Sequence, residues 1–452
     1  MITLNNINLS SIDLSGIDLR GIKLGLGGRG GGSSDGFPVL PGDVTRWHFG
    51  GLTNEMMAAM DDPRIEDADH KGRFLSFKNF AWKEGSGISD IYPGALVFDG
   101  VDDWAGCDNL PLLPKEKGYS IIALRNWITR YDATQYKIPL ISNLDTNDEG
   151  AFLIEYRKDE NVNDVTGSYN SFTDVYIDDN NPITWQTSSS YNGQIIKKGT
   201  SKSTNKLCIC KTYFGQLSNY ANAAIWEIVI LDHDATEEEL TKIKDYFVKT
   251  YPWLFPDQAW TVTGKTNEDE DRATIANITG NGNDLVLSNF GFAEGSGYNE
   301  EGEYAGYLVT DGVDDKVVSK QFKFGENFTV ILDFKFPVKK ISYCGFDLSA
   351  KVRIQNLQDS GVYVVLKGNK TLIPSNVVRA VTSEGKVYDE NWNEYNIVPG
   401  NISSNYTMVN LGFDGSIQFA ESATKLAGIY SSTLSKDECI KAYNYLQTLK
   451  AK

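Results

Sequence analysis

Two clusters of acidic residues are the first candidates for chemistry in this sequence. The segment 99–103 reads D-G-V-D-D and recurs at 311–315, so three carboxylates stand close together twice. Clustered carboxylates are suitable ligands for calcium, which is a hard cation. The same pattern is equally typical of a tight turn, because Asp-Gly supplies a positive φ and Asp side chains hold nearby backbone N–H groups. We expect the turn, and we expect no metal ion or other cofactor.

Few other residue types offer catalytic chemistry. The chain has only three histidines, His48, His70 and His233, so few residues could contribute to a Ser-His-Asp triad or a His-rich metal centre. The five cysteines are odd in number and show no C-x-x-C spacing, so they predict neither a disulfide framework nor a zinc site. Cys208 and Cys210 lie two apart in an apolar run, which predicts that they share one face of a strand in a reduced core.

Sugar binding is the function for which the remaining residue types are most suitable. Protein–sugar sites combine an aromatic surface with a few placed polar groups, and two stretches have this composition. The candidates for carbohydrate contact are Tyr169, Phe172, Tyr176, Trp185 and Tyr191 in the first stretch and Tyr388, Trp392 and Tyr395, with Tyr406 nearby, in the second. Most tryptophans precede residue 256, which favours the first stretch. The alternative is that these aromatics form oligomer interfaces or loop cores.

The composition limits the classes of protein to which the chain can belong. A length of 452 residues suits two domains of roughly 200 residues each. Hydrophobic residues make up 41% and charged residues 23%, as in globular proteins. The net charge of -17 repels phosphate backbones, so nucleic acid is not an expected partner. No apolar run approaches the roughly 20 residues that a transmembrane helix needs, so a membrane is not expected either.

The chain contains two copies of one unit. Three short segments of the first half return in the second half, in the same order and at a nearly constant offset, which indicates a tandem duplication. The shared segments are W-x3-G-x-T-N-E at 47–55 and 260–268, N-F-x3-E-G-S-G at 79–87 and 289–297, and D-G-V-D-D at 99–103 and 311–315.

Each copy is predicted to consist mainly of strands and to close with a helix. β-Branched and aromatic runs at 94–98, 328–336 and 361–366 predict strands, and Gly, Asn and Asp punctuate the chain between such runs. The apolar runs 223–231 and 425–430 precede short amphipathic helices. Thr236 and Ser435 are the expected N-caps, since acidic residues follow both. Many short strands with such turns favour β-sandwiches over a parallel α/β sheet.

The first 36 residues follow a different pattern. Ile and Leu pairs recur there every five residues, which resembles the pentapeptide-repeat pattern, and a Gly-rich linker follows at 25–36. So few repeats cannot bury their own apolar faces, so we expect this segment to dock on other copies of the chain or on a larger assembly. The alternatives are a strand added to the first domain and plain disorder. The predicted anchor residues are Ile7, Leu9, Ile12, Leu14, Ile17, Leu19, Ile22 and Leu24. The predicted domains are 1–36, 37–256 and 257–452.

The segment Leu96–Asp103 and the closing strand and helix at 227–247 resemble the concanavalin A-like lectin/laminin G-like jelly roll. The resemblance is good over 37–256 and less even over 257–452, where Thr310 stands in place of Phe98. It implies an all-β fold of two tandem concanavalin A-like jelly-roll β-sandwiches, each closing with a short helix, after a short pentapeptide-like N-terminal anchor.

The resemblance also bears on enzymatic activity. Related β-glucanases carry their acids as E-x-D-x-x-E on one strand, and that spacing is absent here. The acidic run 268–271 is not matched by the residues after Glu55 in the first copy, so it is interpreted as a solvated loop and not as a pair of catalytic carboxylates. We therefore expect a protein that is not an enzyme, with a glycan-degrading enzyme as an alternative.

Two further segments, 266–272 and 280–284, resemble structural proteins of the crAss-like tailed phages. The resemblance implies a virion head or tail fibre, assembled in the bacterial cytoplasm and displayed on the virion surface. Its expected partners are itself, as a dimer or trimer, other virion proteins through the N-terminus, and host or mucosal glycans. A purely structural capsid decoration is the main alternative. A bacterial surface adhesin is disfavoured because residues 1–10 do not resemble a signal peptide.

Overall fold

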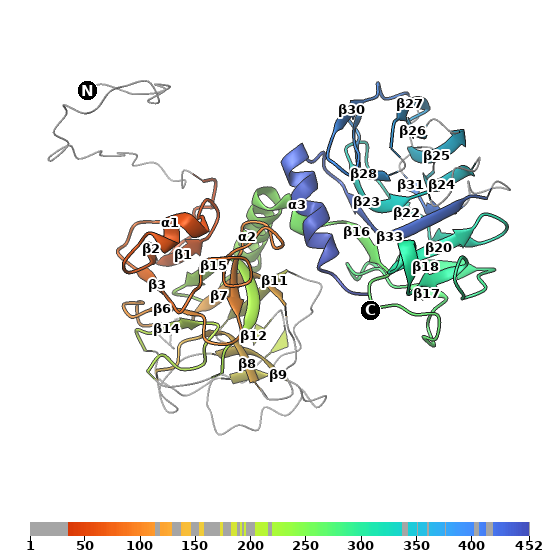
Figure 1. Cartoon of the computed structure of the whole chain (residues 1–452). Coiled ribbons are helices and arrows are strands. Elements are labelled where there is room, and N and C mark those ends of the chain that lie inside the picture. Colours follow the sequence, from red (N-terminus) through yellow and green to blue (C-terminus); the bar gives the residue numbers. More distant parts are fainter. Residues whose placement is uncertain are drawn as a thin grey trace, which may run out of the picture. The chain divides into compact units, whose positions relative to one another are not determined.

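The computed structural model (Figure 1) describes residues 35–113, 118–128, 137–145, 153–157, 172–174, 182–187, 190–191, 194–195, 204–215, 219–336, 342–349, 351–358, 361–375, 377–401, 406–412 and 419–451. The chain divides into residues 1–39 and 40–452, and the fold described here belongs to the second unit. The predicted anchor residues lie outside the described residues, namely Ile7, Leu9, Ile12, Leu14, Ile17, Leu19, Ile22 and Leu24.

The described part of the first copy forms two sheets. The first sheet has the order β13 (Gln194–Ile195), β12 (Ser190–Tyr191), β11 (Ile183–Thr187), β7 (Ser120–Trp127), β15 (Asn222–Leu231), β5 (Leu96–Asp99) and β4 (Gly87–Ile88), and β1 (Val44–His48) also pairs with β15. The second has the order β10 (Phe172–Asp174), β9 (Leu153–Arg157), β8 (Lys137–Ser142), β14 (Leu207–Ile209), β6 (Trp104–Cys107), β3 (Phe74–Lys78) and β2 (Arg64–Glu66). Their strands pair antiparallel, apart from the parallel pair β9–β10.

The described part of the second copy repeats this plan. Its first sheet has the order β19 (Gly297–Asn299), β20 (Tyr307–Asp311), β33 (Glu421–Tyr430), β23 (Thr329–Lys335), β28 (Val377–Thr382), β29 (Lys386–Tyr388) and β30 (Glu394–Asn396), and β16 (Gln258–Thr261) pairs with β33. Its second has the order β17 (Thr274–Ile275), β18 (Leu285–Ser288), β21 (Lys316–Ser319), β32 (Val409–Leu411), β24 (Ser342–Leu348), β25 (Val352–Gln358), β26 (Gly361–Leu366) and β27 (Asn369–Ile373). A further pair joins β22 (Phe322–Lys323) and β31 (Tyr406–Thr407).

The helices are few in the described residues, and their positions follow from local sequence. They are α1 (Asn54–Ala58), α2 (Glu237–Thr250) and α3 (Lys436–Gln447), with the 3-10 turns η2 (Pro252–Leu254) and η3 (Gly302–Tyr304). Thr236 and Ser435 cap α2 and α3 as predicted, and each forms a full capping box with the Glu three residues later. None of the described helices has the length and apolar character needed to cross a bilayer.

Each sandwich encloses its own apolar core. Trp47, Phe98 and Ile225 belong to the core of the first copy, and Trp260, Phe328 and Phe346 to that of the second. The predicted strands are present as β5, β23, β26, β15 and the second half of β33. The predicted all-β fold class, with two tandem β-sandwiches that each end in a helix, is confirmed. The predicted domain boundaries stay predictions.

The expectation for the two neighbouring cysteines is wrong in one respect. All five cysteines are buried and carry free thiols. However, β14 ends at Ile209, and Cys210 has a φ of 58°, in the left-handed region. The chain therefore turns between the two residues, so Cys210 joins the apolar core of the first copy whereas Cys208, although buried, does not.

Candidate functional site

The segments that the two copies share are joined by hydrogen bonds in each sandwich. The side-chain amide of Asn54 donates to Ile88 O at 2.8 Å and accepts from Ile88 N at 2.7 Å. In the second copy Asn267 makes the same pair of bonds to Tyr298, at 2.8 Å each. The T-N-E segment is thereby fixed to the strand that begins at the last residue of E-G-S-G.

The same network continues into the D-G-V-D-D segments. Asn79 Nδ2 donates to Asp102 O at 3.0 Å, and its counterpart Asn289 donates to Asp314 O at 2.9 Å. Ser296 Oγ also donates to Asp315 Oδ1 at 3.1 Å. The three shared segments are therefore one structural unit in each copy, and this explains why they recur together.

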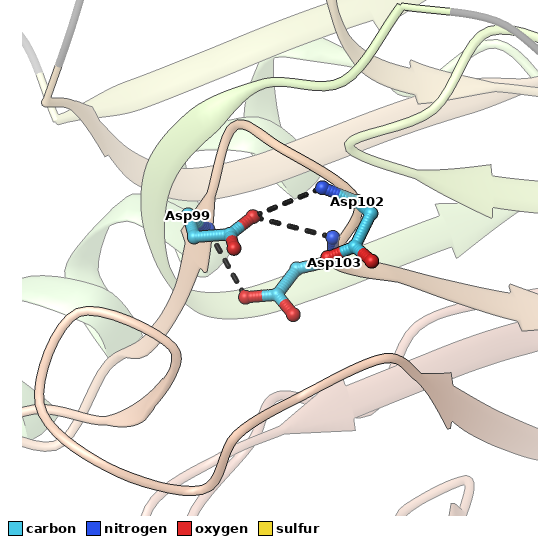
Figure 2. Close-up of side chains that lie close together, drawn as sticks. All are labelled: Asp99, Asp102 and Asp103. Carbon is cyan, nitrogen blue, oxygen red and sulfur yellow. Dashed lines mark hydrogen bonds between the residues drawn. The ribbon is translucent and has the colours of Figure 1, made fainter.

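The acidic clusters form the turn that their sequence predicts. Asp99 Oδ1 accepts from the backbone N–H of Val101 at 2.8 Å. It also accepts from the N–H groups of Asp102 and Asp103 at 3.2 and 3.3 Å, and Asp103 Oδ2 accepts from Asp99 N at 3.1 Å (Figure 2). The carboxylates lie within 4.8 Å of one another in both copies. These bonds form a turn of the predicted kind, and they involve one oxygen each of Asp99 and Asp103.

Burial has an electrostatic consequence at these turns. Desolvation raises the pKa of Asp103 to about 7, and the nearby charges of Asp99 and Asp102 act in the same direction, against hydrogen bonds from Ser86 and Asp99. In the second copy desolvation raises the pKa of Asp315 to about 6. Each sandwich thus holds a carboxyl that titrates near neutral pH.

Most carbohydrate-binding candidates of the first copy cannot be placed relative to one another. Tyr169 and Tyr176 lie outside the described residues. Phe172 and Tyr191 lie in β10 and β12, and their side chains are outside the described part of the chain. Trp185, in β11, is partly exposed, and Lys244 Nζ of α2 lies 5.7 Å from the centroid of its ring. This group stays a prediction.

Three candidates of the second copy come together on one hairpin, formed by β29 and β30, whereas Tyr406 lies in β31, which pairs with β22. Tyr388 ends β29 and is 3% exposed, so its ring supports the hairpin and is not available to a ligand. Trp392, in the connecting turn, is partly exposed and lies 6.1 Å from Tyr388, between ring centroids. The Trp392 ring also packs edge-to-face against Tyr443 of α3, with 5.8 Å between the ring centroids. Tyr395, in β30, packs against the core.

A single carboxylate organises this turn. Asp389 Oδ1 accepts from the backbone N–H groups of Asn391 and Asn393, both at 2.9 Å. Its Oδ2 accepts from Asn393 Nδ2 and from the Tyr395 hydroxyl, also at 2.9 Å each. Burial acts to raise the pKa of Asp389, but these hydrogen bonds outweigh it and the pKa lies below its ordinary value, so the side chain is ionised at neutral pH.

The backbone at Trp392 is strained. Its φ is 61°, in the left-handed region that bulky side chains rarely adopt. Such a conformation costs about 1–3 kcal/mol and persists only where its surroundings enforce it, and such positions cluster at active sites, ligand clamps and switch regions. The bonds to Asp389 on both sides of Trp392 provide that enforcement.

A buried carboxylate also fixes the support of Trp392. Asp333, in β23, accepts from Tyr307 OH and Gln447 Nε2 at 2.8 Å, from Tyr443 OH at 3.2 Å, and from Arg379. The Arg379 guanidinium lies 4.6 Å from the centroid of the Tyr443 ring. The ring against which Trp392 rests is therefore held by hydrogen bonds and by a cation–π contact. No sequence pattern pointed to Asp333, Arg379 or Tyr443, because they meet only in the folded chain.

Comparisons with known proteins give a likeness to solved structures alone. No protein-family model matches the chain, and no curated protein matches it. A sialidase of Trypanosoma rangeli in complex with sialic acid is 10% identical, over 84% of this chain and 67% of the sialidase, with a TM-score of 0.31. Domain 4 of AbnA, a GH43 extracellular arabinanase from Geobacillus stearothermophilus, is 13% identical over 42% of this chain and 98% of that domain, with a TM-score of 0.28. At these values the likeness assigns neither an activity nor a ligand to this chain.

These comparisons correct one expectation and leave another untested. The chain was expected not to be an enzyme, but the solved structures that it resembles include sialidases and part of an arabinanase, so this exclusion is withdrawn. The sequence excludes one spacing of acids on one strand, whereas carboxylates from different strands can also meet in a β fold. The resemblance to lectins and to crAss-like phage proteins stays a prediction.

Proposed function

We propose that this chain binds glycans through the turn that carries Trp392. The observation that supports the proposal is the enforced conformation of this tryptophan, which is partly exposed, strained and held by Asp389. The side chains of Asn391 and Asn393 are exposed on either side of it. An indole presents an apolar surface to the C–H face of a sugar ring, and amides exchange hydrogen bonds with its hydroxyl groups.

We also propose that the chain acts on the surface of a phage virion, docked through residues 1–24. The support for this role is the Ile/Leu repeat followed by a Gly-rich linker. Display in many copies would turn weak binding at each Trp392 turn into strong adhesion. If residues 1–24 join chains, a chain that begins at residue 37 should be monomeric in light scattering where the full chain is a dimer or trimer. An unchanged mass per particle would exclude this mode of assembly.

The glycan proposal is tested with the full chain on beads, screened against host capsular and mucin glycans. Trp392→Ala should lose retention, because truncation removes a stacking contact of about 1 kcal/mol at every site on the bead. Trp185→Ala is the comparison variant for the predicted contacts of the first copy, and it keeps its retention if the Trp392 turn is the site. Far-UV circular dichroism and the unfolding midpoint must be unchanged in both variants.

Each outcome of this screen bears on the proposal. Loss of retention in Trp392→Ala alone supports it. Loss in Trp185→Ala alone moves the site to the first copy and rejects the Trp392 turn. Absence of retention on every glycan rejects sugar binding and favours a purely structural decoration.

A further inference from the structure

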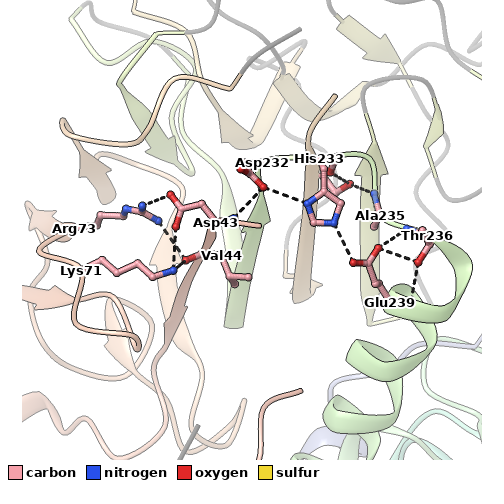
Figure 3. A network of polar contacts seen from close by, with 10 residues as sticks. Asp43, Val44, Lys71, Arg73, Asp232, His233, Ala235, Thr236 and Glu239 are labelled. Atoms are coloured by element: carbon pink, nitrogen blue, oxygen red, sulfur yellow. Dashed lines mark hydrogen bonds and ion pairs between the residues drawn. The ribbon is translucent and has the colours of Figure 1, made fainter. Parts of the chain in front are cut away.

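His233 lies between two carboxylates in the turn that joins β15 to α2. Its Nδ1 is 3.2 Å from Asp232 Oδ1, and its Nε2 is 3.0 Å from Glu239 Oε1 (Figure 3). A neutral imidazole has one N–H and can donate to only one of these oxygens, while the other would face a lone pair. Only the imidazolium donates to both, so the geometry is that of the protonated ring.

Each of the two carboxylates also accepts hydrogen bonds from other residues, and these bonds link the histidine to two distant parts of the chain. Asp232 Oδ1 also accepts from Asp43 N at 3.0 Å, directly before β1. Glu239 Oε2 accepts from the backbone N–H and the hydroxyl of Thr236, both at 2.8 Å, and so completes the N-cap of α2. The imidazolium therefore bridges the entry of the first sandwich and the beginning of its closing helix.

The chain passes very close to this bridge at Gly42. A Cβ atom at this position would lie 2.2 Å from Asp232 Oδ1 and 3.1 Å from His233 Nδ1, and the φ of Gly42 is 74°. A side chain here would displace the carboxylate from the histidine. Glycine at position 42 thus permits the chain before β1 to lie against Asp232 and His233.

The surrounding charges determine the protonation of His233. Asp232 and Asp234 are its neighbours in the turn, Glu239 faces it from α2, and Asp43 lies behind Asp232, paired with Lys71 at 3.0 Å and with Arg73. Burial acts to lower the pKa of His233, but the bonds and charges of Asp232 and Glu239 outweigh it, so the pKa lies above 6.5.

The second copy builds the same turn without a histidine. Ser120 Oγ donates to His233 O at 2.9 Å and accepts from Ala235 N at 2.7 Å. In the second copy Thr329 Oγ1 donates to Ser432 O at 2.9 Å and accepts from Leu434 N at 2.8 Å. Ser432 thus stands in the place of His233, which means that the fold itself does not need the imidazole.

We propose that His233 is a proton-operated clasp that links Asp232, which holds Asp43, to Glu239 at the N-terminus of α2. The link is closed when the imidazole is charged and loosened when it is neutral, while the backbone pairing of β1 with β15 persists. The stability that it contributes is fully present below 6.5, the ordinary pKa, and is lost as the pH rises through the higher folded-state pKa. The segment that it holds leads from residues 1–39 into the first sandwich.

The first test is an NMR titration of the imidazole protons in the full chain, which has three histidines. His233→Gln identifies the signal of His233 by removing it. Its midpoint should lie above 6.5, and a midpoint that is higher by one pH unit corresponds to about a tenfold change in the linked opening equilibrium. A midpoint at or below 6.5 overturns the proposal, and this readout in the wild type remains decisive even if the variant folds poorly.

The second test is hydrogen exchange of residues 40–48 relative to residues 253–261, the matched entry segment of the second copy. This ratio cancels the intrinsic pH dependence of exchange. In the wild type it should rise as the pH passes the His233 midpoint. The rise should be absent in His233→Gln and present in His70→Gln, since the His70 side chain is 81% exposed. The same rise in His233→Gln as in the wild type would overturn the clasp.

Discussion

A buried ion pair beneath α2 allows a quantitative test of how the closing helix is held. Arg46 Nη1 donates to Glu227 Oε1 at 2.9 Å, and the two side chains are 1% and 0% exposed. Tyr246 and Tyr251 donate to Glu227 Oε2 at 3.3 and 2.8 Å. Replacing Glu227 by Leu removes the carboxylate that pairs with the buried guanidinium of Arg46 and the acceptor of both phenols.

The expected magnitude follows from the cost of an uncompensated buried charge. Removing one partner of a buried pair lowers the free energy of unfolding by about 3–5 kcal/mol. The double variant Arg46→Met/Glu227→Leu removes both charges of the pair. Apolar replacement of a buried ion pair often leaves the stability of the folded protein unchanged or raises it. The phenols of Tyr246 and Tyr251 still lose an acceptor, at about 1–3 kcal/mol for each. We therefore expect the double variant to be more stable than Glu227→Leu alone.

The assay is urea unfolding followed by tryptophan fluorescence, because most of the nine tryptophans lie in the first copy. The control is Glu238→Leu, which removes a surface partner of Lys242 from side chains that are 78% and 49% exposed. This change should cost at most about 1 kcal/mol. The reasoning is refuted if the losses of the two single variants add up in the double variant, because additivity means that the two charges do not interact.

Three further predictions concern the shared segments and the thiols. Gly87→Ala should lower the free energy of unfolding by at least about 1–3 kcal/mol, since its φ is 148° and a Cβ would lie 2.3 Å from Asn54 Oδ1. For Asp103, the pKa is raised from 3.8 to about 7 in the folded state, so the stability that it contributes is lost as the pH rises between these values, and Asp103→Asn should flatten the fall of the unfolding midpoint over this range. Burial raises the pKa of Cys107 to about 11 and that of Cys439 to about 12, so a thiol-specific reagent at pH about 8 should label the native chain slowly and the unfolded chain fully.

Each of these predictions has a control or a contradicting result. Gly85→Ala has the same kind of strain, at a φ of 85°, but no atom within 4 Å of the new Cβ, so it should cost less than Gly87→Ala. Equal losses would mean that the contact with Asn54 is unimportant. Parallel curves for Asp103→Asn and the wild type would contradict the raised pKa of this carboxyl. Rapid labelling of any thiol in the native chain would contradict the burial of the cysteines.

The sequence predicted the turn of the candidate site better than its support. Trp392 and Tyr395 were recognisable because aromatic residues alternate there with polar ones over a short span, and a hairpin brings such neighbours together. Asp389 was missed, although its position before Asn391 and Asn393 is a local turn signal. Asp333 and Tyr443 were not predictable, because they lie far from the hairpin along the chain and meet it only when α3 packs on the sheet.

The sequence by itself determined the duplication, the all-β class and the capped closing helices, because these depend on residues that lie close together along the chain. Thr236 and Glu239 form a capping box wherever their backbone turns into a helix. Only the tertiary structure decided which side chains meet across the sandwich, such as Arg46 with Glu227 or Asp43 with Asp232. Those contacts depend on the register between strands that are distant in sequence, and no local pattern records that register.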